Sequence, residues 1–202
     1  MSKERFQRLE QEIIFSETRQ GHSSEDIRWI IARETIRDSE TEEIFTRSFL
    51  RHPGVAAIVP ITTSGEILMI EQFRYSAGRS TWEIPAGMMR GHLQDGLLLP
   101  LESPEEAAER ELREEAGIRA GKLVPVRQFY TMPGTSDGLV YLFLAFGLKS
   151  DPLPSDVGEV VTRIEFFTIE RALEMTVTGE VCDAKTMIGI YSAKHYKDTV
   201  GF

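Results

Sequence analysis

The sequence contains, at residues 102–118, the stretch ESPEEAAERELREEAGI, which is typical of a helix with a defined beginning and end. Ser103 and Glu106 have the spacing of a capping box, and Pro104 stands where a first helical turn tolerates proline. Gly117 stands where a helix C-cap is expected. The stretch therefore predicts a helix over residues 103–116.

One face of this predicted helix is apolar and the neighbouring arc is acidic. At about 100° per residue, Ala108 and Leu112 share a face that must pack on a sheet. Glu111, Glu114 and Glu115 fall on the adjacent arc, because residues three and four apart are neighbours on a helix. Each pair of such carboxylates is destabilising by roughly a few tenths of a kcal/mol.

The acidic arc has two interpretations. It is either a solvated face with arginine pairs at four-residue spacing, such as Arg110 with Glu114, or a metal-binding surface. Mg²⁺ prefers oxygen ligands and commonly bridges a few carboxylates to substrate phosphates. Composition alone favours the solvated face, whereas the full residue pattern favours the metal.

Composition limits the class of protein. The 202 residues are 41% hydrophobic, which is enough for one sizeable core plus a small appendage. There is no apolar run of about 18 residues, and the first residues, MSKERFQRLEQ, lack the apolar core of a signal peptide. The single cysteine, Cys182, fits a reducing compartment, so we expect a cytoplasmic protein. A net charge of -9 argues against nucleic-acid binding.

Strands and helices are expected along the rest of the chain without regular alternation, which favours an α+β or sandwich-like fold. We expect an N-terminal β subdomain at residues 1–52 and a main domain at residues 53–202, with a long loop that ends at about residue 102. The predicted strands are 26–35, 44–51, 54–61, 67–73, 82–85, 123–130, 139–148 and 162–168, and the further helices are 169–176 and 183–196, the last with Asp183 as N-cap.

The stretch at 102–118 resembles the signature of Nudix hydrolases, G-x5-E-x7-R-E-U-x-E-E-x-G-U, in which U is aliphatic. Every fixed position is met from Glu102 to Ile118. The resemblance implies a Nudix-type α/β/α sandwich with a mixed sheet, plus a small N-terminal antiparallel sheet. It implies that Glu111 and Glu115 bind Mg²⁺, with Mn²⁺ as a substitute, and that Glu114 is a nearby ligand or water-orienting group. Arg110 and Glu102 would support the geometry of loop and helix.

The glycine of the signature has two candidates. Gly96 has the consensus spacing to Glu102. In the family, however, this glycine belongs to a P-A-G turn, and residues 85–87 here read Pro-Ala-Gly. In that interpretation Gly87 is the structural equivalent, and the loop before Glu102 holds nine extra residues.

The segment EQFRYSAGRSTWEIPAG, residues 71–87, resembles the segment before the signature in ADP-ribose pyrophosphatases. This implies that Glu83 and the backbone carbonyl of Ala86 also bind metal and that Arg74 contacts the substrate. A guanidinium suits phosphate or ribose oxygens, and Arg51 is a second candidate for that role. The alternatives are an arginine-paired carboxylate at Glu83 and a surface ion pair at Arg74.

TMPGTSDGLVYLFLAFGL, residues 131–148, resembles the loop and strand after the signature, where the family motif S-P-G-x-[ST]-[DE]-E ends in a catalytic or metal-binding carboxylate. Here Asp137 is followed by Gly138. Either the usual base is missing, or Asp137 replaces it as a shorter carboxylate, or the segment is a simple turn. Residues 183–186, DAKT, resemble a helix start of the same subfamily, which we interpret as structural.

The implied reaction is Mg²⁺-dependent hydrolysis of the diphosphate bond of ADP-ribose or a related nucleoside diphosphate sugar, giving AMP and ribose 5-phosphate. The catalytic candidates are Glu114, Glu115 and Asp137, of which Glu114 or Asp137 would orient or deprotonate the attacking water. Two alternatives stay open. One is a GDP-mannose or UDP-sugar pyrophosphatase, and the other is a regulator that only binds a nucleotide.

Relatives of this subfamily are usually homodimers whose N-terminal sheets exchange and help to bind the base. We therefore expect a homodimer with a small-molecule ligand and with neither nucleic acid nor membrane as a partner. Trp29 or Phe45 would stack on a purine. The alternative for both is a core position.

Overall fold

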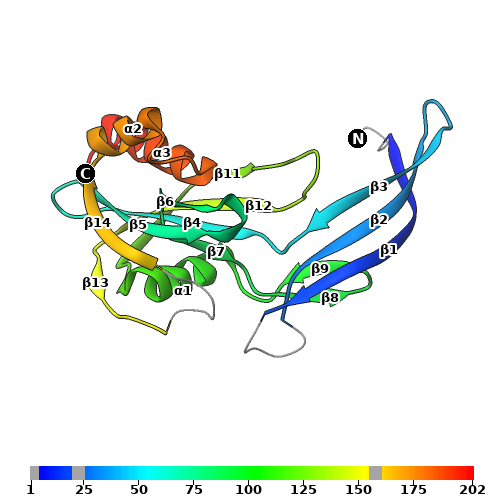
Figure 1. Cartoon of the computed structure of the whole chain (residues 1–202), viewed down its shortest axis with the longest axis horizontal. Coiled ribbons are helices and arrows are strands. Elements are labelled where there is room, and N and C mark those ends of the chain that lie inside the picture. Colours follow the sequence, from blue (N-terminus) through cyan, green and yellow to red (C-terminus); the bar gives the residue numbers. More distant parts are fainter. Residues whose placement is uncertain (1–4, 20–25, 155–160) are drawn as a thin grey trace.

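The computed structural model describes residues 5–19, 26–154 and 161–202. Figure 1 shows a sandwich of sheets and helices at one end of the long axis and a separate N-terminal sheet at the other. No helix in these three ranges is long and apolar enough to cross a membrane.

The sandwich is built around two sheets. The first has the order β11-β12-β4-β7, and its strands are Lys122–Tyr130, Leu139–Phe146, Val55–Pro60 and Ala86–Met88. The second has the order β14-β5-β6, and its strands are Val161–Thr168, Glu66–Arg74 and Arg79–Glu83. The first sheet is mixed, because β4 and β12 run parallel while the other neighbours run antiparallel. The short elements nearby are η1 (Tyr75–Ala77), β10 (Ile118–Arg119) and β13 (Lys149–Ser150).

Helices cover both faces of the sandwich (Figure 1). The helix α1 (Pro104–Ala116) lies on one side, and α2 (Ile169–Thr178) and α3 (Ala184–Thr199) lie on the other. Strand β4 separates two apolar clusters, because successive side chains of a strand point to opposite faces. Its Ile58 packs in the cluster with α1, and Val59 packs in the cluster with α2 and α3. The expected α+β class and α/β/α sandwich are confirmed.

The caps of α1 are those that the sequence predicts. The backbone N–H of Glu106 donates to Ser103 Oγ at 3.2 Å, and the Glu106 carboxylate accepts from Ser103 N at 2.8 Å. Gly117 ends the helix in the left-handed conformation with φ 67°. Ala108 and Leu112 are fully buried, so the apolar face packs as expected.

The N-terminal sheet consists of β1 (Phe6–Thr18), β2 (Ile27–Asp38) and β3 (Ile44–Arg51), paired antiparallel in that order. The sequence predicts β2 and β3 but not β1. Most residues of β1 are exposed, so it lacks the alternation of buried and exposed positions that identifies a half-buried strand.

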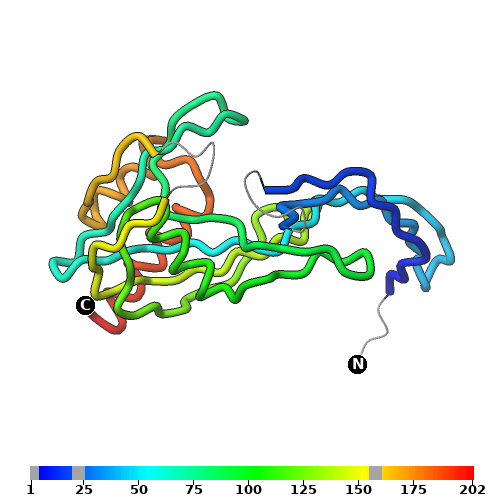
Figure 2. The backbone as a smooth tube through the Cα atoms, turned by 90° about the horizontal axis from the view of Figure 1, so that it is seen from below, coloured from blue at the N-terminus to red at the C-terminus, as the bar shows by residue number. Residues whose placement is uncertain are grey.

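The prediction of a long loop before α1 is wrong, because this segment contains a hairpin of β8 (Gly91–Gln94) and β9 (Leu97–Pro100). Asp95 and Gly96 form its turn with φ of 51° and 77°, as a two-residue hairpin turn requires. The hairpin extends toward the N-terminal sheet (Figure 2), where the Gln11 side chain donates to the Gly96 carbonyl. Gly96 is therefore a turn residue, and the extra residues connect the sandwich to the N-terminal sheet.

We predict that Ser103→Ala lowers the free energy of unfolding by about 1 kcal/mol, because the N-terminal N–H groups of α1 lose their side-chain acceptor. Urea denaturation followed by circular dichroism measures this change. The matched control is Ser39→Ala, in an exposed turn, which should stay within about 0.5 kcal/mol of wild type. Equal losses in the two variants would contradict the capping role.

Candidate active site

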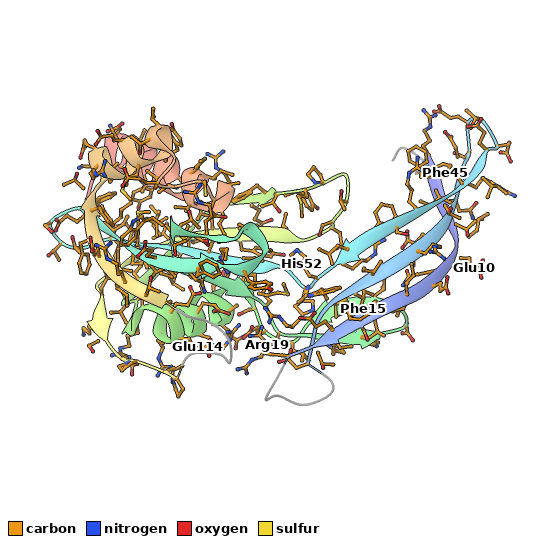
Figure 3. The ribbon with its side chains drawn as sticks, in the orientation of Figure 1. Glu10, Phe15, Arg19, Phe45, His52 and Glu114 are labelled. Carbon is orange, nitrogen blue, oxygen red and sulfur yellow. The ribbon has the colours of Figure 1, made fainter. Side chains whose placement is uncertain are left out.

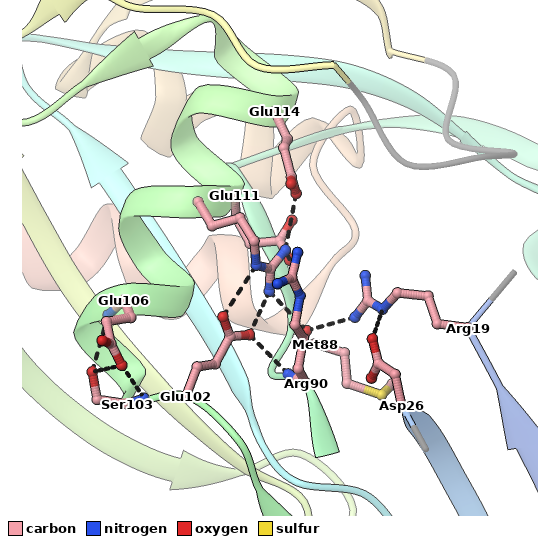
Figure 4. Close-up of polar contacts among 10 residues, drawn as sticks. Arg19, Asp26, Met88, Arg90, Glu102, Ser103, Glu106, Glu111 and Glu114 are labelled. Atoms are coloured by element: carbon pink, nitrogen blue, oxygen red, sulfur yellow. Dashed lines mark hydrogen bonds and ion pairs between the residues drawn. The ribbon is translucent and has the colours of Figure 1, made fainter. Parts of the chain in front are cut away.

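Arg110 lies at the centre of an acidic cluster on α1 (Figure 4). Its guanidinium contacts Glu102 at 2.7 Å and Glu114 at 2.9 Å, and it also pairs with Glu111. It donates to the Met88 carbonyl at 3.2 Å as well. Arg110 thus connects the helix to the segment before it, as the resemblance implies.

Within the acidic cluster, Arg110 favours the ionised form of Glu102. Burial raises the pKa of Glu102, but hydrogen bonds from Arg110 and from the backbone N–H of Arg90 outweigh it, so the pKa lies below its ordinary value. Burial lowers the pKa of Arg110, but its carboxylate partners outweigh this effect and raise the pKa far above the usual range. Arg110 is thus shared among three carboxylates, which form an oxygen-rich arrangement of the kind that Mg²⁺ prefers.

Two further carboxylate contacts lie under strand β7. Glu111 and Glu115 are 2% and 4% exposed, and the Ala86 N–H donates to Glu115 at 2.8 Å. A Cβ at Gly87 would lie 2.0 Å from the carboxyl carbon of Glu111. Only glycine leaves room for that carboxylate, so Gly87, and not Gly96, contacts the helix as the second interpretation of the signature requires.

Glu83 is buried at the end of β6 and is held by two cations. Arg74 donates two hydrogen bonds to it, at 2.8 and 2.6 Å, and Lys185 Nζ donates a third at 2.6 Å. Burial raises the pKa of Glu83, but Arg74 and Lys185 outweigh burial and hold the pKa below its ordinary value. The arginine pair considered for Glu83 is therefore present.

The predicted metal ligands fit a hard cation by their chemistry. Within the described ranges, no three His, Cys, Asp or Glu side chains form a ready-made metal cage. Glu111 and Glu115 of α1 nevertheless offer buried carboxylate oxygens beside a backbone that lacks a side chain at Gly87. Mg²⁺ commonly takes only one or two protein carboxylates and completes its shell with water and substrate phosphate. The metal roles of Glu83, Ala86, Glu111 and Glu115 stay predictions.

A cavity of about 260 Å³ lies beside the backbone of residues 86–88. Its lining includes three cationic side chains, those of Arg28, Arg74 and Lys185, and the imidazole of His52. Among the residues that the structure describes, the lining includes no carboxylate, although the whole chain carries a net charge of -9. This local reversal of charge suits an anionic ligand.

The other predicted site residues lie outside this lining. Arg51 pairs with Asp137 at 2.7 Å and with Glu34 at 2.6 Å. Trp29 packs on Phe15 with ring centroids 5.2 Å apart. Of the predicted substrate contacts, the structure thus places Arg74 in the cavity and Arg51 and Trp29 beside other partners.

Phe45, the other candidate for stacking on a purine, is half-buried in β3. Its ring meets Phe6 edge-on, with centroids 6.2 Å apart. It does not line the cavity that holds Arg74.

Sequence reasoning missed Arg28, His52 and Lys185 as cavity residues. Asp183 does cap α3, because its carboxylate accepts from Thr186 N at 2.9 Å, so the structural interpretation of residues 183–186 holds for the cap. Lys185 follows immediately and points to Glu83 instead. A lysine in the first turn of a helix, where the macrodipole disfavours cations, was the available signal.

Comparisons with known proteins agree with the signature. The NUDIX domain model matches residues 50–185. The chain is 40% identical to the ADP-ribose pyrophosphatase of Bacillus subtilis (strain 168), over 71% of this chain and 74% of that protein. It is 36% identical to the methanol dehydrogenase activator of Bacillus methanolicus, again over 71% and 74% of the two chains.

A solved structure described as an ADP compounds hydrolase has the same fold. It superposes with a TM-score of 0.73 at 18% identity and covers 100% of this chain and 98% of its own. Together with the family model and the identity to curated relatives, this shows that the chain belongs to the NUDIX family and is a Nudix hydrolase.

Proposed function

We propose that this protein hydrolyses the diphosphate bond of ADP-ribose or a related nucleoside diphosphate sugar with Mg²⁺, giving AMP and ribose 5-phosphate. The observation that carries the proposal is the position of the 86–88 backbone. Buried carboxylates of α1 contact this backbone, and a cavity lined by cations lies beside it. The name of the Bacillus subtilis relative favours ADP-ribose as the first substrate to test.

The cavity supplies the groups that bind the diphosphate. The guanidinium of Arg74 offers paired donors that match phosphate oxygens, and Lys185 adds a compact positive charge. Arg28 contributes a third positive charge from strand β2. Because Arg74 and Lys185 also hold Glu83, the substrate would share its two cations with a candidate metal ligand.

The carboxylates supply the metal site and the proton acceptor. Glu83, the Ala86 carbonyl, Glu111 and Glu115 would hold Mg²⁺, or Mn²⁺ as a substitute. A bound cation of this kind neutralises charge on a diphosphate and lowers the pKa of a bound water. Both water-orienting candidates are paired with an arginine, Glu114 with Arg110 at 2.9 Å and Asp137 with Arg51 at 2.7 Å, so both stay candidates.

A regulator that binds a nucleotide without turnover is the second candidate. The absence of a carboxylate at Gly138 favours it, as does the name of the Bacillus methanolicus relative, a methanol dehydrogenase activator. A pyrophosphatase for GDP-mannose or a UDP-sugar would use the same site with a different base pocket.

We predict that, with Mg²⁺, ADP-ribose gives the highest kcat/KM in a panel that also holds GDP-mannose, UDP-glucose and NADH. Phosphate release with a coupled phosphatase measures turnover, and chromatography should identify AMP and ribose 5-phosphate as products. Faster turnover of GDP-mannose or UDP-glucose would favour the nucleotide-sugar alternative. No turnover of any compound would favour the regulator.

We predict that Glu115→Gln lowers kcat by about 10²–10³-fold, as loss of a group that stabilises transition-state charge typically does. The matched control is Glu105→Gln, an exposed glutamate in the first turn of the same helix, which should keep kcat within about twofold. A kcat for Glu115→Gln within about tenfold of wild type would contradict its role.

We also propose a homodimer formed through the N-terminal sheet. Large apolar side chains on this sheet are between 44% and 57% exposed in the single chain, namely Phe6, Leu9, Ile14, Phe15 and Ile44. Such patches commonly mark interaction sites. Light scattering should give about twice the chain mass of 22.9 kDa, and a single-chain mass at micromolar concentration would exclude a stable dimer.

A cytoplasmic location, which the single cysteine favours, is tested by cell fractionation.

A further inference from the structure

The space beside Gly138 is filled by His52. A Cβ built on Gly138 would lie 1.5 Å from His52 Nε2 and 1.9 Å from Cε1. These distances are far below any real contact, so a side chain at position 138 and this His52 ring exclude each other. Position 138 is also one of the two positions, with 137, at which the family motif of residues 131–148 leads one to expect the final acidic residue.

The connection between β3 and β4 fixes the orientation of His52, which lies where the N-terminal sheet meets the sandwich (Figure 3). The Gly54 N–H donates to His52 Nδ1 at 3.3 Å. A neutral imidazole has one acceptor and one N–H nitrogen, so acceptance at Nδ1 leaves the hydrogen on Nε2. Nε2 is therefore a donor beside Gly138, where a side chain at position 138 would begin.

The neutral form of the ring is the favoured one. Burial lowers the pKa of His52, and the nearby charge of Asp137 opposes this only in part. The same ring lines the cavity that holds Arg28, Arg74 and Lys185. All four side chains are hydrogen-bond donors, so the ligand groups that they suit are acceptor oxygens.

We propose that His52 takes the place of the absent side chain at position 138 with the opposite polarity, as a hydrogen-bond donor to the diphosphate of the bound nucleotide. Its Nε2–H binds a phosphate oxygen and does not accept the proton of the attacking water. That proton then goes to a carboxylate elsewhere, for which Glu114 and Asp137 are the candidates. The identity of the ligand rests on the proposed function, whereas the donor role rests on the geometry of His52.

The test is a double-mutant cycle of His52→Ala and Gly138→Ala. Gly138 has no positive φ, so the backbone tolerates alanine and the His52 ring is the obstacle to the new Cβ. We expect either single variant to weaken binding of the non-hydrolysable adenosine 5′-(α,β-methylene)diphosphate with Mg²⁺ by about tenfold to a hundredfold in calorimetry. The double variant should bind no worse than His52→Ala, because the ring that Gly138→Ala displaces is already gone.

A second variant separates a donor from a structural role. The amide of His52→Gln can donate a hydrogen bond, so we expect its affinity to lie within about threefold of wild type. Additive losses in the cycle, or wild-type affinity in His52→Ala, would overturn the proposal. So would loss of the acidic limb of the kcat–pH profile in His52→Ala, because that limb would identify His52 as the base.

Failure of the proposed function gives a different result. If wild type binds the methylene analogue but hydrolyses no compound of the panel, hydrolysis is wrong, and the cycle still tests His52 through affinity. If wild type does not bind the analogue, both the diphosphate ligand and the donor role are overturned.

Discussion

The balance of Arg110 against its three carboxylates is the interaction on which the site depends. Like charges buried close together favour protonation of one of them, because the interior screens them weakly. Arg110 offsets this repulsion at Glu102, Glu111 and Glu114 at once, and it also donates to the Met88 carbonyl. The same guanidinium therefore offsets charge repulsion within the acidic cluster and holds strand β7 beside it.

The backbone of residues 86–88 then places opposite charges close together. The Ala86 N–H holds Glu115, and Gly87 gives Glu111 the room that any side chain would fill. A nucleoside diphosphate carries negative charge and binds divalent cations, so it needs both kinds of surface. Glu83 contributes to both surfaces, because it is a carboxylate and is paired with two cations that line the cavity, Arg74 and Lys185.

What the sequence predicted was local, and what it missed depends on contacts between distant segments. The caps of α1 follow from residues within one helix, so Ser103 and Gly117 could be assigned as its caps without a structure. Strand β1 is paired along one edge and mostly exposed, so its own sequence holds little signal. The β8–β9 hairpin was predictable from its Asp-Gly turn, a standard hairpin signal that the prediction of a loop overlooked.

His52 shows why the remaining site residues could not be found from the sequence. Strands β4 and β12 pair in parallel with Val55 beside Val140, so the residues that precede each strand meet at the same edge of the sheet. Residues 52 and 138 then compete for one volume, although 85 positions separate them in the chain. Because glycine leaves that volume free, the imidazole of His52 lies at this edge, where the family motif leads one to expect an acidic side chain. If His52 acts there as a donor, as we propose, the proton acceptor must be one of the two remaining candidates, Glu114 or Asp137.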